Sequence, residues 1–178
     1  MTGVPSVMVR AAVPVDAPAM AALHLRAWRA TYAGLIPDEF LAGLKVEERE
    51  ARWRHSLTAP EVAPGERVIV VAEEAGLVVG FVAAGHARGD DEFGMGEVYA
   101  INVDPTAWGR GAGRALLAAA TASLDARFAV SILWVVDRNQ RARAFYERAG
   151  WSVDGATKTE SYGGADVNNC RYRRAARR

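Results

Sequence analysis

The feature that most restricts the fold of this chain is a glycine-rich loop between a strand pattern and a helix pattern. The apolar segment 97–103 predicts a strand, and Gly109, Gly111 and Gly113 follow it in alternation. A helix pattern then opens, and its inward-facing residues are Leu116, Leu117, Ala120 and Leu124. Alternating glycines leave backbone N–H groups uncovered, and the start of a helix adds partial positive charge. The segment therefore predicts a strand–loop–helix cradle for phosphate oxygens.

Two common phosphate-binding motifs do not fit this loop. A Walker loop ends in Gly-Lys-Ser/Thr, but here Gly113 is followed by Arg114. A dinucleotide-binding fingerprint needs a glycine at its sixth position, where this loop has Arg114 or Leu116. A turn without any ligand is the remaining alternative, although three glycines cost more entropy than a plain turn requires. The loop therefore favours the pyrophosphate of another cofactor, with Arg110 and Arg114 beside it.

The rest of the chain alternates strand and helix patterns, which is typical of an α/β fold with a mixed sheet. The expected strands lie at 7–12, 67–72, 77–84, 97–103 and 130–136, with two short ones near 151–153 and 169–174. The expected helices follow Asp16, span about 46–57, open at the glycine-rich loop, and follow Asn139. The polar segment 154–167 is expected to be a loop. We find no linker or repeat, so we expect a single domain over residues 1–178.

The composition narrows the function classes. Lysine and arginine number 22 against 21 acidic residues, and the net charge of +1 argues against binding to nucleic acid or a membrane surface. The single cysteine, Cys170, excludes an intrachain disulfide and a cysteine-based zinc cluster. The three histidines lack metal-ligand spacing, so we expect no metal. Because every apolar run is too short for a membrane span, we expect a cytoplasmic protein.

Two blocks of the sequence follow a known pattern. In the first, Val103, Pro105, Gly111 and Gly113 match Arg/Gln-x-x-Gly-x-Gly/Ala after a strand that ends near Val-x-Pro, with Trp108 in place of the Arg or Gln. In the second, residues 139–151 match Asn-x-x-Ala-x-x-Phe-Tyr-Glu-x-x-Gly-Phe, and segment 24–32 is similar to a first helix of the same pattern. The chain thus resembles the GNAT superfamily of acetyl-CoA-dependent N-acetyltransferases.

The resemblance implies a fold and a cofactor site. The fold would be a mixed, mostly antiparallel sheet of six to seven strands, flanked by about four helices and splayed between the fourth and fifth strands. The pantetheine arm of acetyl-CoA would enter the splay as a pseudo-strand. The residues implied to bind it are Ile101, Asn102, Val103, Gly109, Arg110, Gly111, Ala112, Gly113, Arg114, Asn139 and Tyr146. Asn139 is also expected to cap the helix that follows it. By analogy with many members, we expect a homodimer.

The resemblance also implies two catalytic residues. Tyr146 would give a proton to the leaving thiolate; the alternative is that it only belongs to the apolar stripe of its helix. Glu97, expected on the same strand face as Ile101, would deprotonate the amine. The alternative for Glu97 is a solvated acid at a strand end, and Asp91 and Glu92 are weaker candidates for the base.

The acceptor side is the least determined. Trp28, Tyr32, Glu97 and Tyr162 are expected to contact the acceptor, and Glu160 could recognise a cationic amine, although each could equally be core or surface. We expect transfer of an acetyl group from acetyl-CoA to a primary amine of a small molecule, by direct attack in a ternary complex. The alternatives are a CoA-binding sensor without turnover and a protein acetyltransferase that modifies an α-amino group or a lysine.

Overall fold

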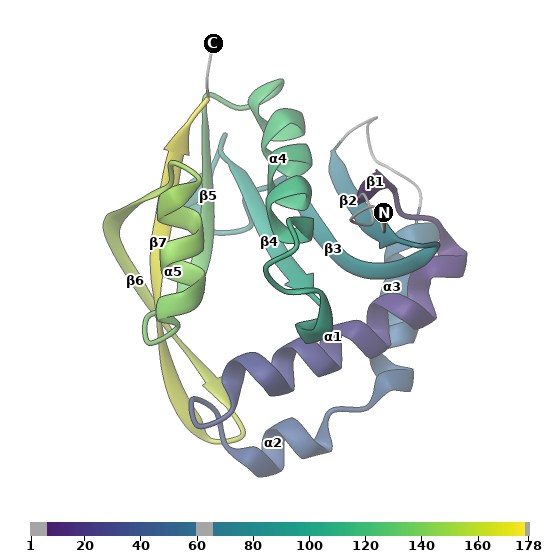
Figure 1. The fold of residues 1–178 in the computed structure, drawn as a ribbon. Helices are drawn as coiled ribbons and strands as arrows, with labels where there is room; N and C mark the ends of the chain where they lie inside the picture. The colour runs from purple at the N-terminus through teal and green to yellow at the C-terminus, as the bar shows by residue number, and fades with distance from the viewer. Residues whose placement is uncertain (1–6, 60–65, 177–178) are drawn as a thin grey trace.

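Seven strands form one sheet in the computed structural model, which describes residues 7–59 and 66–176. The strands are β1 (Met8–Ala11), β2 (Arg67–Glu74), β3 (Leu77–His86), β4 (Gly96–Val103), β5 (Val130–Val136), β6 (Ser152–Tyr162) and β7 (Ala165–Ala175). Their order is β1-β2-β3-β4-β5-β7-β6, and every neighbouring pair is antiparallel except β4 and β5 (Figure 1). The predicted mixed, mostly antiparallel sheet is therefore confirmed.

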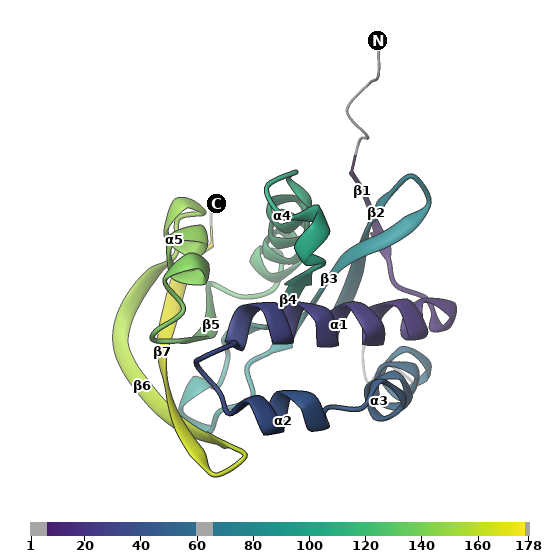
Figure 2. The ribbon, with the colours of Figure 1, turned by 60° about the horizontal axis from the view of Figure 1, so that its bottom comes forward.

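Five α-helices cover the two faces of this sheet in the described part of the chain. They are α1 (Ala17–Tyr32), α2 (Asp38–Gly43), α3 (Val46–Thr58), α4 (Ala112–Asp125) and α5 (Gln140–Arg148). Figure 2 shows α4 and α5 on one side of the sheet and α1, α2 and α3 on the other. The expected number was about four, and the helix not foreseen is α2, whose six residues are too few to show a helical period. In the described residues, no helix combines the length and the apolar character needed to cross a membrane.

The sheet is splayed between β4 and β5, as predicted. The two strands pair only from Gly96 to Val98 on β4 and from Ser131 to Leu133 on β5. Beyond these pairs β4 continues to Val103 and β5 continues to Val136, but the residues of these two segments do not pair with one another. The facing edges of both strands are therefore free to bind another extended chain.

A β-bulge in β4 changes which side chains share a face. Ala83 on β3 pairs with Ala100, whereas Ala84 pairs with Val98, so one extra residue lies on β4 between these pairs. Because paired residues share a face and neighbours alternate, the bulge moves Ile101 to the face of Val98 and of α4. Glu97 lies on the opposite face, toward α1. The expectation that Glu97 and Ile101 share a face is therefore wrong.

The expected loop at 154–167 is instead part of a long hairpin. β6 and β7 pair from Ser152 and Arg173 to Tyr162 and Ala165, and the turn between them is Gly163-Gly164. Both glycines have positive φ angles, 59° and 83°, which suit a tight turn. Polar residues occupy both faces of β6, so the alternation of apolar and polar residues that marks a strand is missing from the sequence.

Candidate active site

A cavity of about 810 Å³ lies where β4 and β5 separate, and α1, α4 and α5 complete its walls. Every residue that was expected to bind the cofactor lines this cavity: Ile101, Asn102, Val103, Gly109, Arg110, Gly111, Ala112, Gly113, Arg114, Asn139 and Tyr146. Of the expected acceptor residues, Tyr32 lines it as well, whereas Trp28, Glu97 and Tyr162 do not. The structure thus brings together two sequence blocks that are about thirty residues apart in the chain.

The glycine-rich loop presents a row of free amide groups to the cavity. Gly109 and Gly111 have φ angles of 79° and 97°, a left-handed conformation that favours glycine. Between residues 109 and 114, no backbone N–H group has a hydrogen-bond acceptor among the described residues; the next amide, of Ala115, bonds to the Gly111 carbonyl at 3.0 Å. Such a row of donors at a helix N-terminus suits the oxygens of a diphosphate.

An arginine stacked on a tryptophan adds charge to the same wall. The Arg141 Cζ atom lies 3.3 Å from the centroid of the Trp108 ring, and both residues line the cavity. The Trp108 Nε1 group donates to the Val103 carbonyl at 2.8 Å, which fixes the ring beside the end of β4. Burial lowers the pKa of Arg141, and the guanidinium stays charged at neutral pH.

A second arginine of this wall is held by a buried carboxylate. The Arg110 Nη2 atom lies 3.1 Å from Oε2 of Glu74, at the end of β2. Glu74 is 5% exposed, and its Oε1 has no hydrogen-bond partner in the described residues. Arg114 and Arg148 also line the cavity. The four arginines give the cavity the positive charge that a phosphate-bearing ligand requires.

Tyr146 is placed by two well-formed ends of α5. The Asn139 side chain accepts from the Ala142 amide at 3.1 Å, so the predicted N-cap is confirmed. At the other end Gly150 has a φ of 85°, and the Trp151 amide bonds to the Tyr146 carbonyl at 3.0 Å. This bonding pattern is a Schellman motif, which stops the helix at a defined residue.

The Tyr146 hydroxyl is suited to donate a proton. The side chain is 8% exposed and lines the cavity, and the hydroxyl has no hydrogen-bond partner among the residues that the structure describes. Burial raises the pKa of Tyr146 well above that of a free tyrosine, with a smaller contribution from nearby Tyr32. The phenol therefore stays protonated at neutral pH and can donate to a ligand in the cavity.

Glu97 lies outside the cavity lining, and its carboxylate is bound by one arginine. Its Oε2 accepts from the Arg88 backbone amide at 3.1 Å and from Nε at 3.2 Å, and its Oε1 accepts from Nη2 at 3.1 Å. The Arg88 Cζ atom also lies 4.1 Å from the centroid of the Tyr99 ring. Glu97 is thus neither solvated nor free, which fits neither of the two roles expected for it.

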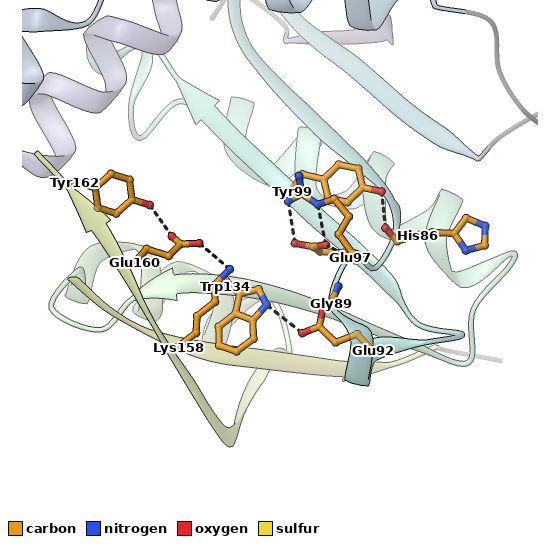
Figure 3. Close-up of polar contacts among 10 residues, drawn as sticks. His86, Gly89, Glu92, Glu97, Tyr99, Trp134, Lys158, Glu160 and Tyr162 are labelled. Atoms are coloured by element: carbon orange, nitrogen blue, oxygen red, sulfur yellow. Dashed lines mark hydrogen bonds and ion pairs between the residues drawn. The ribbon is translucent and has the colours of Figure 1, made fainter. Parts of the chain in front are cut away.

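A second carboxylate, Glu160 on β6, faces this group in Figure 3. It accepts from the Tyr162 hydroxyl at 2.6 Å and pairs with Lys158 Nζ at 2.9 Å. Burial acts to raise the pKa of Glu160, but the bonds from Tyr162 and Lys158, with the charge of Arg88, lower it below its ordinary value. Glu160 is therefore ionised at neutral pH.

Aromatic rings join the acceptor side to the cavity. The Trp28 ring lies 4.9 Å from Tyr32 and 5.9 Å from Tyr162, measured between centroids, and Tyr162 lies 5.8 Å from Phe40 on α2. Burial raises the pKa of Tyr32, and the charge of Glu160 raises it further. Trp28, Tyr32, Tyr162 and Glu160, all expected on the acceptor side, thus form one contiguous group.

Sequence reasoning missed several residues of these two regions, among them Arg88, Trp134, Arg141, Arg148 and Lys158. Arg141 could have been found, because it follows the Asn139 cap and therefore lies at the helix end nearest the phosphate loop. Trp134 lines the cavity from β5, and its Nε1 donates to Glu92 at 3.2 Å. Arg88 carries no signal in the sequence, since only the pairing of β3 with β4 brings it to Glu97. Lys158 was missed because its strand, which it shares with its partner Glu160, was expected to be a loop. Glu92, a weaker candidate for the base, is buried, and its carboxylate accepts the hydrogen bond from Trp134.

The fold and the splayed sheet with its lined cavity are those of an acyltransferase. This chain belongs to the acetyltransferase (GNAT) family, which matches residues 25–151. The uncharacterized N-acetyltransferase YuaI of Bacillus subtilis is 36% identical to it over 135 residues, which are 75% of this chain and 73% of that protein.

Solved structures agree on the fold. The PaiA N-acetyltransferase of Thermoplasma acidophilum, solved in complex with coenzyme A, has a TM-score of 0.71 at 17% identity and covers 96% of this chain and 99% of its own. YncA of Salmonella typhimurium, solved with its cofactor acetyl-CoA, has a TM-score of 0.68 at 19% identity and covers 96% of this chain and 94% of its own. At these identities the two structures show the fold alone.

Proposed function

We propose that this protein transfers an acetyl group from acetyl-CoA to the primary amine of a small molecule, by direct attack in a ternary complex. The observation that carries the proposal is that one cavity joins unpaired amides at residues 109–114 to the buried phenol of Tyr146. The amides suit a diphosphate, and the phenol suits a leaving thiolate. The two similar structures with coenzyme A and acetyl-CoA support the same donor.

The donor would be held along the free edge of β4. The diphosphate would lie on the amides of the glycine-rich loop, with Arg110, Arg114 and Arg141 around it. The pantetheine arm would pair with backbone groups of residues 101–103, which have no partner on β5. A backbone N–H of this edge would polarise the thioester carbonyl and stabilise the oxyanion of the tetrahedral intermediate.

The chemistry needs one proton donor and one neutral amine. The amine nitrogen attacks the carbonyl carbon, the C–S bond breaks, and the thiolate takes the Tyr146 proton. The phenolate then regains a proton, by way of water, from the nitrogen that attacked. The products are the acetylated amine and coenzyme A with a free thiol, so no covalent enzyme intermediate is required.

Glu97 is not well placed as the direct base. Both of its oxygens accept hydrogen bonds from Arg88, and the side chain lies outside the cavity lining, so neither oxygen faces an amine in the cavity. We propose instead that the ammonium form first loses one proton to solvent, by way of water that passes Glu160, and that the resulting neutral amine then attacks. Glu160, held ionised, would attract the ammonium form to the site.

A small acceptor is favoured over a peptide by the contacts around the acceptor side. Tyr162 on β6 contacts Trp28 on α1 and Phe40 on α2, which narrows the approach between the hairpin and the two helices. An extended peptide would need an open groove at this place. A protein acetyltransferase remains the second candidate, because the cavity that would bind acetyl-CoA would serve either kind of acceptor.

Thiol release from acetyl-CoA tests the proposal. Purified protein is mixed with acetyl-CoA and single small amines or amine-bearing peptides, and the acetylated product is identified by mass. Release that depends on a small amine is expected. Release with peptides only would favour the protein acetyltransferase, and tight binding of acetyl-CoA without release would favour the sensor.

A further inference from the structure

We propose that Arg88, held in place by Glu97, receives an anionic group of the acceptor, so that the acceptor is a primary amine that also carries a carboxylate. An α-amino acid is the simplest member of this class. The inference rests on the proposed function, since it concerns the acceptor of the same reaction, but it assigns a different residue and a different chemical group.

The contacts of Arg88 leave one edge of its guanidinium open. Nε and Nη2 bond to the two oxygens of Glu97, and Nη1 has no hydrogen-bond partner in the described residues. The Arg88 side chain is 64% exposed, while that of Glu97 is 6% exposed. A buried carboxylate therefore fixes one edge of an arginine whose other edge can bind a second carboxylate through two parallel hydrogen bonds.

The bulge in β4 helps to orient this arginine. Tyr99, the extra residue of the bulge, places its ring under the Arg88 guanidinium, and its hydroxyl donates to the His86 carbonyl. The Tyr99 ring and the carboxylate of Glu97 thus both contact the guanidinium. Little side-chain entropy is then lost when Arg88 binds a ligand, which is the advantage of a prearranged site.

The charges around Arg88 fit a zwitterion. Glu97 is satisfied by Arg88, and Glu160, across from it, is paired with Lys158. Arg88 and Glu160 also attract each other electrostatically. An ammonium beside Glu160 and a carboxylate beside Arg88 would add no net charge to the site. An amine without an anionic group would leave the open edge of Arg88 unpaired.

This arrangement also directs the amine toward the thioester. Glu160 acts electrostatically on Tyr32, which lines the cavity together with Tyr146. Glu97 adjoins Val98, the last residue of β4 that pairs with β5 before the splay. An acceptor that spans from Arg88 to Glu160 would therefore lie beside the closed end of the splay, where β4 and β5 stop pairing, with its amine on the side of Glu160 and Tyr32.

Matched acceptors that differ only in the carboxylate test the inference. The pairs are L-phenylalanine with phenethylamine, L-methionine with 3-(methylsulfanyl)propylamine, and L-leucine with 3-methylbutylamine. We expect the wild type to prefer the amino acid of at least one pair by about tenfold or more in kcat/KM, as a charge-assisted contact would provide. In Arg88→Gln this ratio should fall to about twofold or less, mainly through KM, and Arg88→Lys should restore part of it.

Two variants complete the design. Glu97→Gln should lower the same ratio, because Glu97 acts through Arg88, whereas loss of a direct base would lower kcat for both members of a pair. Arg54→Gln, at an exposed position of α3 where Arg54 pairs with Glu50, is the matched control. Calorimetry with coenzyme A should give the same affinity for Arg88→Gln as for the wild type, since Arg88 lies outside the cavity lining.

The outcomes separate this inference from the proposed function. Equal kcat/KM for the members of every pair, or a ratio that Arg88→Gln leaves unchanged, overturns the inference while the acetyltransferase stands. If the wild type acetylates none of these amines, calorimetry with each of the three amino acids on the coenzyme A-loaded protein decides. Binding that Arg88→Gln abolishes supports the anionic subsite even without turnover, and no binding of the three amino acids overturns it.

Discussion

The Arg141 guanidinium is stacked on the indole of Trp108, with its Cζ atom 3.3 Å from the ring centroid. Trp108 stands where the family pattern has an arginine or glutamine. Arg141, in the first turn of α5, thus places a positive charge beside Trp108, where the pattern would have its own polar side chain. The hydrogen bond from Trp108 to the Val103 carbonyl fixes the indole on which Arg141 stacks. One aromatic residue therefore replaces a side-chain contact by positioning another residue.

Arg141→Ala should weaken the binding of coenzyme A by about tenfold, because a charge-assisted contact with a phosphate is lost. Trp108→Leu should weaken it by a smaller factor, since the guanidinium remains but is no longer held. Isothermal calorimetry at two salt concentrations measures both effects, and the salt dependence should be shallower for Arg141→Ala. Equal affinities for Arg141→Ala and the exposed-helix control Arg54→Ala would contradict the assignment.

Substitution of two loop glycines by alanine should change the stability of the protein at one position and leave it unchanged at the other. Gly111 has a φ of 97°, so Gly111→Ala should cost about 1 kcal/mol or more of stability and should also disturb the amides of the cradle. An alanine Cβ at Gly113 would meet Phe145 and Val103 at 3.6 Å, which is ordinary contact, so Gly113→Ala should keep the wild-type stability. Urea unfolding and coenzyme A affinity of this matched pair check the prediction, and equal losses would refute it.

Tyr146→Phe should lower kcat by about 100-fold while leaving coenzyme A affinity nearly unchanged, because only the proton donor is removed. Stability should also be preserved, since the hydroxyl has no partner among the described residues that would be left unsatisfied. Steady-state thiol release, calorimetry and urea unfolding measure the three quantities. A full-rate Tyr146→Phe enzyme would leave Tyr146 with a packing role alone.

The cofactor cavity could be predicted from the sequence because its parts are local. The conformations of Gly109 and Gly111, and the cap of α5 by Asn139, depend on residues a few positions apart. A positive φ angle favours glycine and a helix N-cap favours a short polar side chain, so both features can be predicted from the residue types in the sequence. The buried stripe of α5, which includes Tyr146, follows from helical periodicity for the same reason.

The acceptor side could not be predicted because its contacts depend on register. Arg88 reaches Glu97 only across the β3–β4 connection, and Lys158 and Glu160 meet on a strand that had been expected as a loop. The bulge at Tyr99 reverses the faces of β4, and nothing in its composition marks it. A one-residue shift decides which face of the sheet Glu97 occupies, so its face could not be predicted from the spacing to Ile101.

The pH dependence of turnover should follow the acceptor amine. Burial keeps the pKa of Tyr146 high and the contacts of Glu160 keep its pKa low, so neither group changes charge between pH 6 and 9. Amines with a pKa near 10 are mostly protonated in this range, and kcat/KM should rise about tenfold per pH unit up to that pKa. Profiles for two acceptors of different pKa should be displaced by that difference, and a shared inflection near pH 7 would reveal a protein base.

Stability should fall on mild acidification because of His24. Its ring is 5% exposed among Trp28, Trp53 and Phe81, and its Nδ1 has no partner in the described residues. Burial, with a smaller effect of Arg49, lowers its pKa to about 3. Between pH 6.5 and 3 the unfolded chain therefore binds a proton that the folded chain does not, and the free energy of unfolding falls as the pH falls.

The size of this effect can be measured with a single variant. From pH 7 to pH 5.5 the contribution of His24 should be about 1 kcal/mol, given an unfolded pKa near 6.5. His24→Leu should remove that part of the pH dependence, whatever its own effect on stability, whereas His55→Leu on exposed α3 should retain it. Urea unfolding of the wild type and the two variants at both pH values gives one difference for each protein, and an unchanged slope in His24→Leu would show that the buried imidazole is not the group that titrates.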